Sequence, residues 1–230
     1  ISLSTLFSGR YFSQLHWELY GKGSRRFSYP AEDASPRFPE LLSAAGVHTA
    51  MVGGALFLEN RFGVARGFRE QRMLVQNNEH AMGTDVVNAL IEQMRVADAS
   101  KPAFFYVHLL EPHHPYDRGT RKDGPALDRY VSEIALVDGL VARLARVMEE
   151  RFGSRAILIV TSDHGEAFGE HGTVQHSKTV YGECLRVPLL IRGHGIAPRR
   201  IDQRVGLVDL GPTILDLFGV PTPASFMGQS

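Results

Sequence analysis

The sequence predicts an α/β fold in which a central, mostly parallel sheet is packed between helices. Short runs of β-branched and aromatic residues alternate with stretches of helical periodicity, as expected for strands that helices connect. The runs are almost continuously apolar, which is typical of strands that are buried on both faces. The predicted strands are residues 48–52, 103–109, 156–161 and 187–191.

Helices are expected at residues 39–45, from residue 84 onward, at 127–151 and from 212 to 218. Gly46 and Gly219 follow two of them, and glycine commonly ends helices because it adopts the left-handed conformation without strain. Pro212 suits a first turn, where its missing N–H breaks no hydrogen bond. The polar segments 61–80 and 118–124 are expected to be surface loops. A chain of 230 residues can bury one full-sized core, so we expect residues 1–230 to form a single domain.

Charge and cysteine content exclude several classes of partner and site. The 25 Lys and Arg residues balance the 25 Asp and Glu residues, so we expect no nucleic-acid partner, and this balance does not argue against a small anionic substrate. Cys184 is the only cysteine, which excludes an intrachain disulfide and a thiolate metal cluster. The apolar runs are far shorter than the about 20 residues of a membrane span. Because the chain begins at Ile1 within a structured segment, we expect a longer protein, with membrane attachment only through segments upstream of Ile1.

Half of the histidines lie in two loops that directly follow predicted strands. Five of the ten lie in two loops, and these are His113, His114, His164, His171 and His176. Ligands bind to open parallel sheets at the carboxyl ends of the strands, where such loops converge. The two loops therefore predict one binding site.

The strand 156–161 leads into Ser-Asp163-His164-Gly-Glu, which brings a carboxylate and an imidazole out together. This mixed oxygen and nitrogen set suits Zn²⁺ or Mn²⁺, and Ca²⁺ if more carboxylates join. In the alternative interpretation, Asp163 caps the next helix and His164 is a solvated turn residue.

The next loop adds His171, His176 and Lys178, and the earlier loop sets His113 and His114 between two prolines. A metal together with His and Lys side chains makes an anion site, which would hold the oxygens of a phosphate or sulfate. Prolines restrict the backbone and would present the imidazoles rigidly, although a purely structural turn explains the prolines equally well. Taken singly, Lys178 fits a solvated surface lysine and His171 a loop residue.

Several motifs occur in a fixed order along the chain. They are Ser8-Gly9-Arg10-Tyr11, residues 41–53, Gly67-Phe68, residues 108–116, residues 162–166, His176-Ser177-Lys178, Arg186-Val187-Pro188 and residues 208–213. In this order they resemble the sulfatase-like branch of the alkaline phosphatase superfamily over almost the whole chain. The resemblance implies a three-layer α/β/α sandwich with a mixed, mostly parallel sheet that lacks its N-terminal strand.

The resemblance also implies chemistry for individual residues. It makes Asp163 and His164 ligands of a divalent metal, which the sequence does not identify among Ca, Mn and Zn. It makes Lys178 and His113 contacts to the transferred anion, with His176 as a further candidate. The implied activity is hydrolysis or transfer of sulfate or phosphate esters, through attack by an upstream Thr, Ser or modified Cys. We expect the full-length protein to be extracytoplasmic or membrane-anchored.

Two departures from the family pattern change these expectations. In sulfatases the nucleophile is the first residue of a Cys-Xaa-Pro-Ser-Arg motif. Counting back from Gly9 puts this nucleophile about two positions before Ile1 and puts Leu3 at the position of the arginine. The first acidic metal ligands should also lie upstream, so we expect the present chain alone to be inactive. Gly54 and Leu56 replace a lysine and a histidine of sulfatases, which favours phosphoryl or phosphonyl esters, or a transferase, over aryl sulfates. The alternatives are an inactive sulfatase-like anion-binding domain and a plain structural α/β domain.

Overall fold

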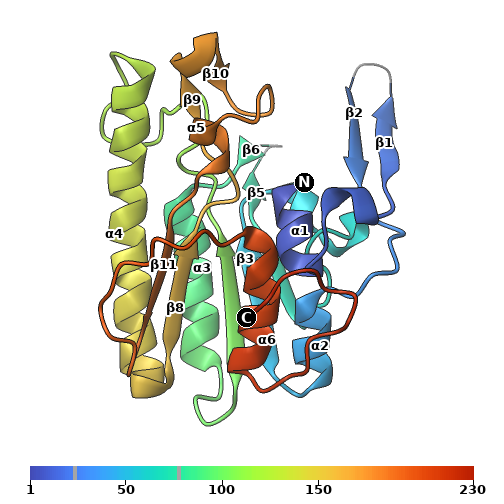
Figure 1. Ribbon diagram of the computed structural model, residues 1–230. Coiled ribbons are helices and arrows are strands. Elements are labelled where there is room, and N and C mark those ends of the chain that lie inside the picture. The colour runs from blue at the N-terminus through green and yellow to red at the C-terminus, as the bar shows by residue number, and fades with distance from the viewer. Residues whose placement is uncertain (23–24, 77–78) are drawn as a thin grey trace. The chain divides into compact units, whose positions relative to one another are not determined.

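A computed structural model describes residues 1–22, 25–76 and 79–230 (Figure 1). The chain forms two compact units. The first contains residues 1–75, 97–107 and 201–230, and the second contains residues 76–96 and 108–200. The expected surface loop 61–80 includes residues 77 and 78, which lie outside the described residues.

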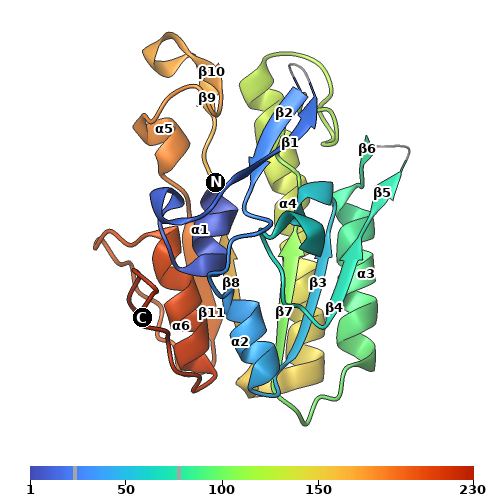
Figure 2. The same ribbon diagram turned by 90° about the vertical axis from the view of Figure 1, so that its right-hand side faces the viewer.

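The first unit is built on a three-stranded sheet in the order β4-β3-β7 (Figure 2). Its strands are β3 His48–Gly53, β4 Glu70–Met73 and β7 Ala103–His108. Residues 49–53 of β3 are buried, as the apolar run predicts. Strand β4 was expected to be loop, and that prediction is wrong because β4 pairs with β3 in parallel. Its polar residues alternate between exposed and half-buried positions, so the strand carries no apolar run.

Three helices complete this unit: α1 Ser2–Ser8, α2 Phe38–Ala44 and α6 Leu210–Leu217. Phe7 of α1 is fully buried, stacks on Phe38 with 5.5 Å between ring centroids, and meets Phe68 and Tyr106 edge to face. Such aromatic pairs add to the free energy of burial. The predicted helices 39–45 and 212–218 are confirmed to within two residues at each end. An antiparallel hairpin, β1 Glu18–Lys22 with β2 Arg25–Tyr29, was not predicted.

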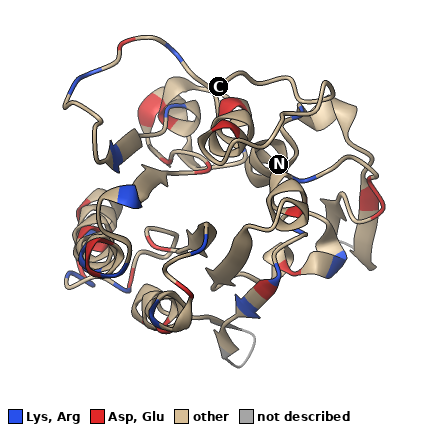
Figure 3. Ribbon diagram, turned by 90° about the horizontal axis from the view of Figure 1, so that it is seen from below, with Lys and Arg blue, Asp and Glu red and all other residues tan. Residues whose placement is uncertain are grey.

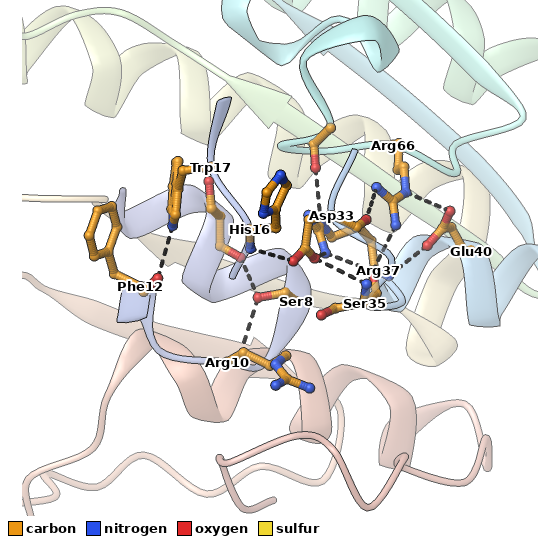
Figure 4. A network of polar contacts seen from close by, with 12 residues as sticks. Ser8, Arg10, Phe12, His16, Trp17, Asp33, Ser35, Arg37, Glu40 and Arg66 are labelled. Atoms are coloured by element: carbon orange, nitrogen blue, oxygen red, sulfur yellow. Dashed lines mark hydrogen bonds and ion pairs between the residues drawn. The ribbon is translucent and has the colours of Figure 1, made fainter. Parts of the chain in front are cut away.

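A buried polar network also holds the first unit together (Figure 4). The guanidinium of Arg37 is inaccessible to solvent and donates to Asp33 Oδ1 at 3.1 Å, to the carbonyl of Gly63 at 2.9 Å and to the carbonyl of Ser35 at 2.7 Å. Burial raises the pKa of Asp33, but hydrogen bonds from the His16 N–H, from Arg37 and from Ser35 outweigh this effect and lower it. The ion pair is thus stabilised by the chain around it.

The second unit contains two long helices, α3 Gly83–Val96 and α4 Ala126–Phe152, which pack on each other (Figure 1). Both confirm the predicted helices at residue 84 onward and at 127–151. Arg143 of α4 donates to Asn88 of α3 at 2.7 Å. Acidic and basic residues are interspersed along the helices (Figure 3). None of the helices within the described ranges combines the length and the apolarity that a membrane span requires.

Strands β8 Ile157–Thr161 and β11 Leu189–Gly193 form the main sheet of the second unit. They pair antiparallel, with Leu189 opposite Thr161 and Gly193 opposite Ile157. We expected their apolar residues to be covered on both faces, and for β11 this prediction is wrong, since Leu190 is 60% exposed and Ile191 is 41% exposed. Successive side chains of a strand point to opposite faces, so both faces of β11 are partly open to solvent.

Short elements connect the rest of the chain. The remaining strands are β5 Val75–Gln76, β6 Glu79–His80, β9 Ala167–Phe168 and β10 Val174–Gln175, and the remaining α-helix is α5 Gly182–Leu185. Single 3-10 turns are Phe12–Gln14, Leu56–Leu58, Asn60–Phe62, Gly153–Arg155, Glu170–Gly172 and Leu207–Asp209. Of these, the hairpin β9–β10 and the helix α5 lie in the loops that carry the candidate site.

Candidate functional site

Asp163 and His164 directly follow β8, as the apolar run before them predicts. The Nδ1 atom of His164 lies 2.9 Å from the carbonyl of Gly165. A carbonyl only accepts hydrogen bonds, so Nδ1 carries the proton and Nε2 of the neutral ring carries the lone pair. Nε2 lies 3.6 Å from Oδ2 of Asp163. Two atoms that can bind a cation therefore face each other at the end of the strand.

A short hairpin brings a second imidazole to this point. Strands β9 and β10 pair antiparallel with Phe168 opposite Val174 and Ala167 opposite Gln175. One step further along the same register, Glu166 stands opposite His176. Directly opposed residues of an antiparallel pair are close neighbours, and the Nδ1 atom of His176 lies 3.0 Å from Oε1 of Glu166.

The backbone on both sides of His176 has an uncommon conformation. Gln175 has φ 66° and Ser177 has φ 64°, which is the left-handed region that side chains other than glycine rarely adopt. Such residues cost of order 1 kcal/mol or more each and persist where the surrounding structure holds them, often at functional sites. The left-handed conformations of Gln175 and Ser177 therefore reduce stability, and they orient His176.

The proline-flanked loop supplies the third imidazole. The ring of His113 lies 5.4 Å from the ring of His176, measured between centroids. Its backbone N–H donates to Oε2 of Glu133, and the N–H of Arg118 donates to Oε1 of the same side chain at 2.7 Å. Glu133 is fully buried in α4, so one carboxylate holds both ends of the loop. Burial raises the pKa of Glu133, although the two backbone N–H groups act against this shift.

The structure brings together four of the five residues that the sequence singles out. The ring of His176 stacks on that of His164 at 4.1 Å and meets that of His113, so the two loops converge as expected. Lys178 is the exception, because its ammonium donates to the carbonyl of Val174 in its own loop at 3.1 Å. It lies in that loop, exposed to solvent. His114 packs edge to face on Tyr116.

His171 has partners of its own. Its Nδ1 atom lies 2.9 Å from Oε1 of Glu183, and its ring stacks on Tyr181 at 4.0 Å. The hydrogen bond from His171 lowers the pKa of Glu183. The described residues show no ring contact between His171 and the imidazoles of His113, His164 and His176.

Sequence reasoning missed three residues of the site. Tyr116 donates its hydroxyl hydrogen to Oε2 of Glu166 at 2.7 Å, and both side chains are buried. Burial lowers the pKa of His108, the charge of Asp163 raises it and that of His164 lowers it, so His108 belongs to the same electrostatic environment. The signal that could have found Glu166 is the pair of glycines at 169 and 172, which indicates a tight hairpin between residues 166 and 176.

The side chains of Asp163 and His164 at the end of β8 meet some of the requirements of a divalent-cation site. Asp163 offers an anionic oxygen, and the Nε2 lone pair of His164 is held in place through its other nitrogen, as is usual for metal-bound histidine. Within residues 1–22, 25–76 and 79–230, however, no group of three or more His, Cys, Asp or Glu side chains is arranged to hold a metal ion. If a metal ion binds here, Asp163 and His164 would supply only a part of its coordination shell.

The α/β fold gathers one carboxylate and three imidazoles in the loops after its strands, with Lys178 exposed in one of these loops, and such side chains can bind a cation or an anion. The Sulfatase family model matches residues 2–220 of this chain. The chain therefore belongs to the Sulfatase family, as its motif order indicates.

Known relatives extend well beyond the matched region. The extracellular sulfatase SULF-1 homolog of Drosophila melanogaster is 32% identical over 127 residues, which are 54% of this chain and 11% of that protein. The matched segment is thus a small part of this curated relative.

Solved structures show the same fold. A structure described in complex with its substrate D-glucosamine-2-N,6-O-disulfate superposes with a TM-score of 0.73 at 18% identity, covering 100% of this chain and 68% of that one. A phosphonate monoester hydrolase from Silicibacter pomeroyi superposes with a TM-score of 0.74 at 16% identity, covering 100% of this chain and 65% of that one. The predicted alkaline phosphatase-like α/β fold is confirmed.

Proposed function

We propose that the intact protein hydrolyses or transfers a sulfate or phosphate ester with the help of a divalent metal ion. One observation carries the proposal. The Nε2 lone pair of His164 faces the carboxylate of Asp163 at 3.6 Å while its ring stacks on His176, so a cation-binding pair lies against an imidazole. Family membership and the fold support the same chemistry.

Each residue of the site has a distinct task in this proposal. Asp163 and His164 would hold the metal ion, which supplies Lewis-acid polarisation of the ester when it is bound. His113 and His176 contact the oxygens of the transferred group; in the protonated ring each donates through Nε2 and stabilises the charge that develops on these oxygens. Lys178 adds a positive charge once its ammonium leaves the carbonyl of Val174, which an exposed side chain does at little cost.

Two features of the whole protein are part of the proposal. We place the nucleophile about two positions before Ile1, on the register of the motif at Gly9, together with further acidic ligands for the metal. This chain alone would then bind anions without turnover. We also propose that the full-length protein works outside the cytoplasm or on a membrane, which the extracellular sulfatase among its relatives supports.

Two classes of ester are candidates for the substrate. Relatives named as sulfatases support a sulfate ester. Phosphoryl or phosphonyl esters are supported by Gly54 and Leu56, which leave no cationic side chain where sulfatases have Lys and His, and by the structural likeness to a phosphonate monoester hydrolase. We favour the second candidate on the residues of this chain.

Two substitutions in the intact protein test the proposal. His164→Ala should lower metal content and turnover together, because it removes a ligand. Lys178→Ala should keep the metal and slow turnover by about 10-fold or more, because it removes a charge that stabilises the transition state. Both are assayed on aryl sulfate, phosphate monoester and phosphonate monoester, with metal measured in the same samples.

Melting temperatures without metal serve as the control and should be nearly the same in the wild type and both variants. Unchanged activity in both variants would refute the proposed site. A preference for aryl sulfate would refute the choice of ester. Stoichiometric metal binding without turnover on any of the three esters would favour the inactive anion-binding relative.

A further inference from the structure

A buried carboxylate lies behind one imidazole of the site and has no role in the chemistry proposed above. The side chain of Glu166 is 5% exposed, and its two oxygens have different partners. Oε1 lies 3.0 Å from Nδ1 of His176, and Oε2 accepts the hydroxyl hydrogen of Tyr116 at 2.7 Å. Glu166 therefore links a buried phenol to an imidazole of the cluster.

The direction of these hydrogen bonds follows from the groups involved. An ionised carboxylate only accepts, so Nδ1 of His176 must donate, and in the neutral ring the lone pair then lies on Nε2. Burial, and then the hydrogen bond to Glu166, raise the pKa of Tyr116, so the phenol keeps its proton and remains a donor. The phenol occupies Oε2, which leaves Oε1 for His176.

The backbone makes this arrangement rigid. The β9–β10 register sets Glu166 opposite His176, and the left-handed residues on both sides of His176 fix the direction of its side chain. Tyr116 has φ 59°, and its ring packs against those of Tyr130 and Phe168. Each member of the chain of contacts is thus held by an independent feature.

We propose that Glu166 is a positioning residue that fixes the tautomer and the ring plane of His176, so that Nε2 is the nitrogen presented to the transferred anion. Tyr116 fixes the carboxylate in turn. The presentation to the anion rests on the proposed function, whereas the tautomer does not. Without Glu166, Nδ1 and the ring plane would no longer be held, and Nε2 of the protonated ring would not be directed at the anion. Loss of a supporting carboxylate is a known way in which catalysis is slowed.

The same unit contains a matched control. His171 and Glu183 form a second pair with nearly the same Nδ1 to Oε1 distance, 2.9 Å. The side chain of His171 is 52% exposed and that of Glu183 is 14% exposed, against 22% for His176 and 5% for Glu166. Hydrogen bonds are stronger where water is excluded, so the control pair should fix its imidazole less firmly.

Nitrogen NMR of the histidine side chains tests the tautomer directly. In the ¹⁵N-labelled protein, at a pH where the imidazoles are neutral, His176 should show a protonated Nδ1 and an unprotonated Nε2; its signals are assigned by their loss in His176→Asn. Glu166→Gln should shift this equilibrium towards protonated Nε2 or a mixture, because an amide can donate to Nδ1. Glu183→Gln should change the signals of His171 and leave those of His176 as they are.

Tyr116→Phe provides a graded variant, since it keeps the contact of Oε1 with His176 and removes the partner of Oε2. Its effect on the His176 signals should be smaller than that of Glu166→Gln. If Glu166→Gln does not fold, Glu166→Asp keeps the charge, moves it by one methylene and should still weaken the tautomer preference. His176 signals that match the wild type in every folded variant of Glu166 would overturn the proposal.

Turnover in the intact protein separates positioning from mere stability. Glu166→Gln should lower kcat by about 10- to 100-fold with little change in KM, and Glu183→Gln should change neither. A change in KM alone, or an equal loss in both variants, would overturn the role of Glu166 in presenting Nε2. If the wild type has no activity on any ester, the proposed function fails, while the NMR result still decides the tautomer.

Discussion

Two polar networks in this protein each contain a buried carboxylate, but they differ in whether their last member is exposed to solvent. In the first unit, the guanidinium of Arg37 is inaccessible to solvent. Its Nε and Nη1 atoms donate to Asp33 and to two backbone carbonyls, while Nη2 is buried with no hydrogen-bond partner among the described residues. In the second unit, the chain of contacts from Tyr116 through Glu166 ends on His176, whose side chain is 22% exposed beside two further imidazoles. The first network is enclosed in the core and acts on the stability of the fold, and we call it the closed network. The second ends at a ring that a ligand can reach, and we call it the open network.

The largest effect is expected from breaking the closed network. Asp33→Asn removes the counter-charge of Arg37 and leaves a buried cation, which should lower the free energy of unfolding by about 3–5 kcal/mol. Urea denaturation measures the loss. The histidine NMR signals of the second unit should stay unchanged, and a large change in them would show that the two networks are coupled.

A smaller effect is expected from crowding the loop that holds the open network. A Cβ atom on Gly165 would lie 2.0 Å from the carbonyl oxygen of Glu183, so Gly165→Ala must displace that backbone. We expect a loss of about 1–3 kcal/mol and weaker metal binding, measured by denaturation and by metal titration.

Gly139→Ala in α4 is the control for that substitution. Apart from adjacent residues and the backbone of the helix itself, no atom of the described residues lies within 4 Å of the added methyl group. It should stabilise the protein by about 0.5–1 kcal/mol. Equal stability changes in the two variants would contradict the role of the close approach at Gly165.

The pH dependence of stability sharpens the comparison. The pKa of Asp33 is lowered in the folded protein, so its contribution is present above the ordinary pKa of an aspartate and is lost as the pH falls through the lowered value. Denaturation between pH 6 and pH 3 should show this loss in the wild type. The slope over this range should be smaller in Asp33→Asn, and an equal slope would exclude Asp33 as its source.

The smallest effect on stability is expected at Glu40, which lies at the edge of the closed network. Glu40 accepts from Arg66 at 2.9 Å and from the backbone N–H of Arg37 at 2.7 Å, and its side chain is half-buried. Glu40→Gln keeps one acceptor and should cost about 1 kcal/mol, as a partly solvated hydrogen bond does. Urea midpoints measured beside those of Asp33→Asn would show whether the buried pair dominates.

Periodicity explains how much of the fold could be predicted. Strand β3 and helices α3 and α4 have long apolar runs or stripes, because a core selects for them at every second or at every third and fourth residue. Strand β4 reads Glu-Gln-Arg-Met and lies at one end of its sheet, where backbone pairing decides the conformation. Such a strand has no apolar pattern, so hydropathy could not predict it.

The candidate site also has a part that the sequence could predict and a part that it could not. Asp163, His164, His113 and His176 could be predicted to converge, since loops at strand ends share one edge of a sheet. The contacts of Glu166 depend on the register of a hairpin whose strands are two residues long, which hydropathy does not determine. The position of Lys178 also depended on local geometry, because a flexible ammonium binds the nearest carbonyl.

The left-handed residues beside His176 also determine which substitutions this loop tolerates. Gln175 and Ser177 contribute their backbone conformation, so selection should act on φ at these positions instead of on side-chain chemistry. In a saturation library, glycine and asparagine should remain frequent at both, while valine, isoleucine and proline should disappear. Such a profile at two positions with no assigned chemistry would show that the constraint on His176 acts through the backbone.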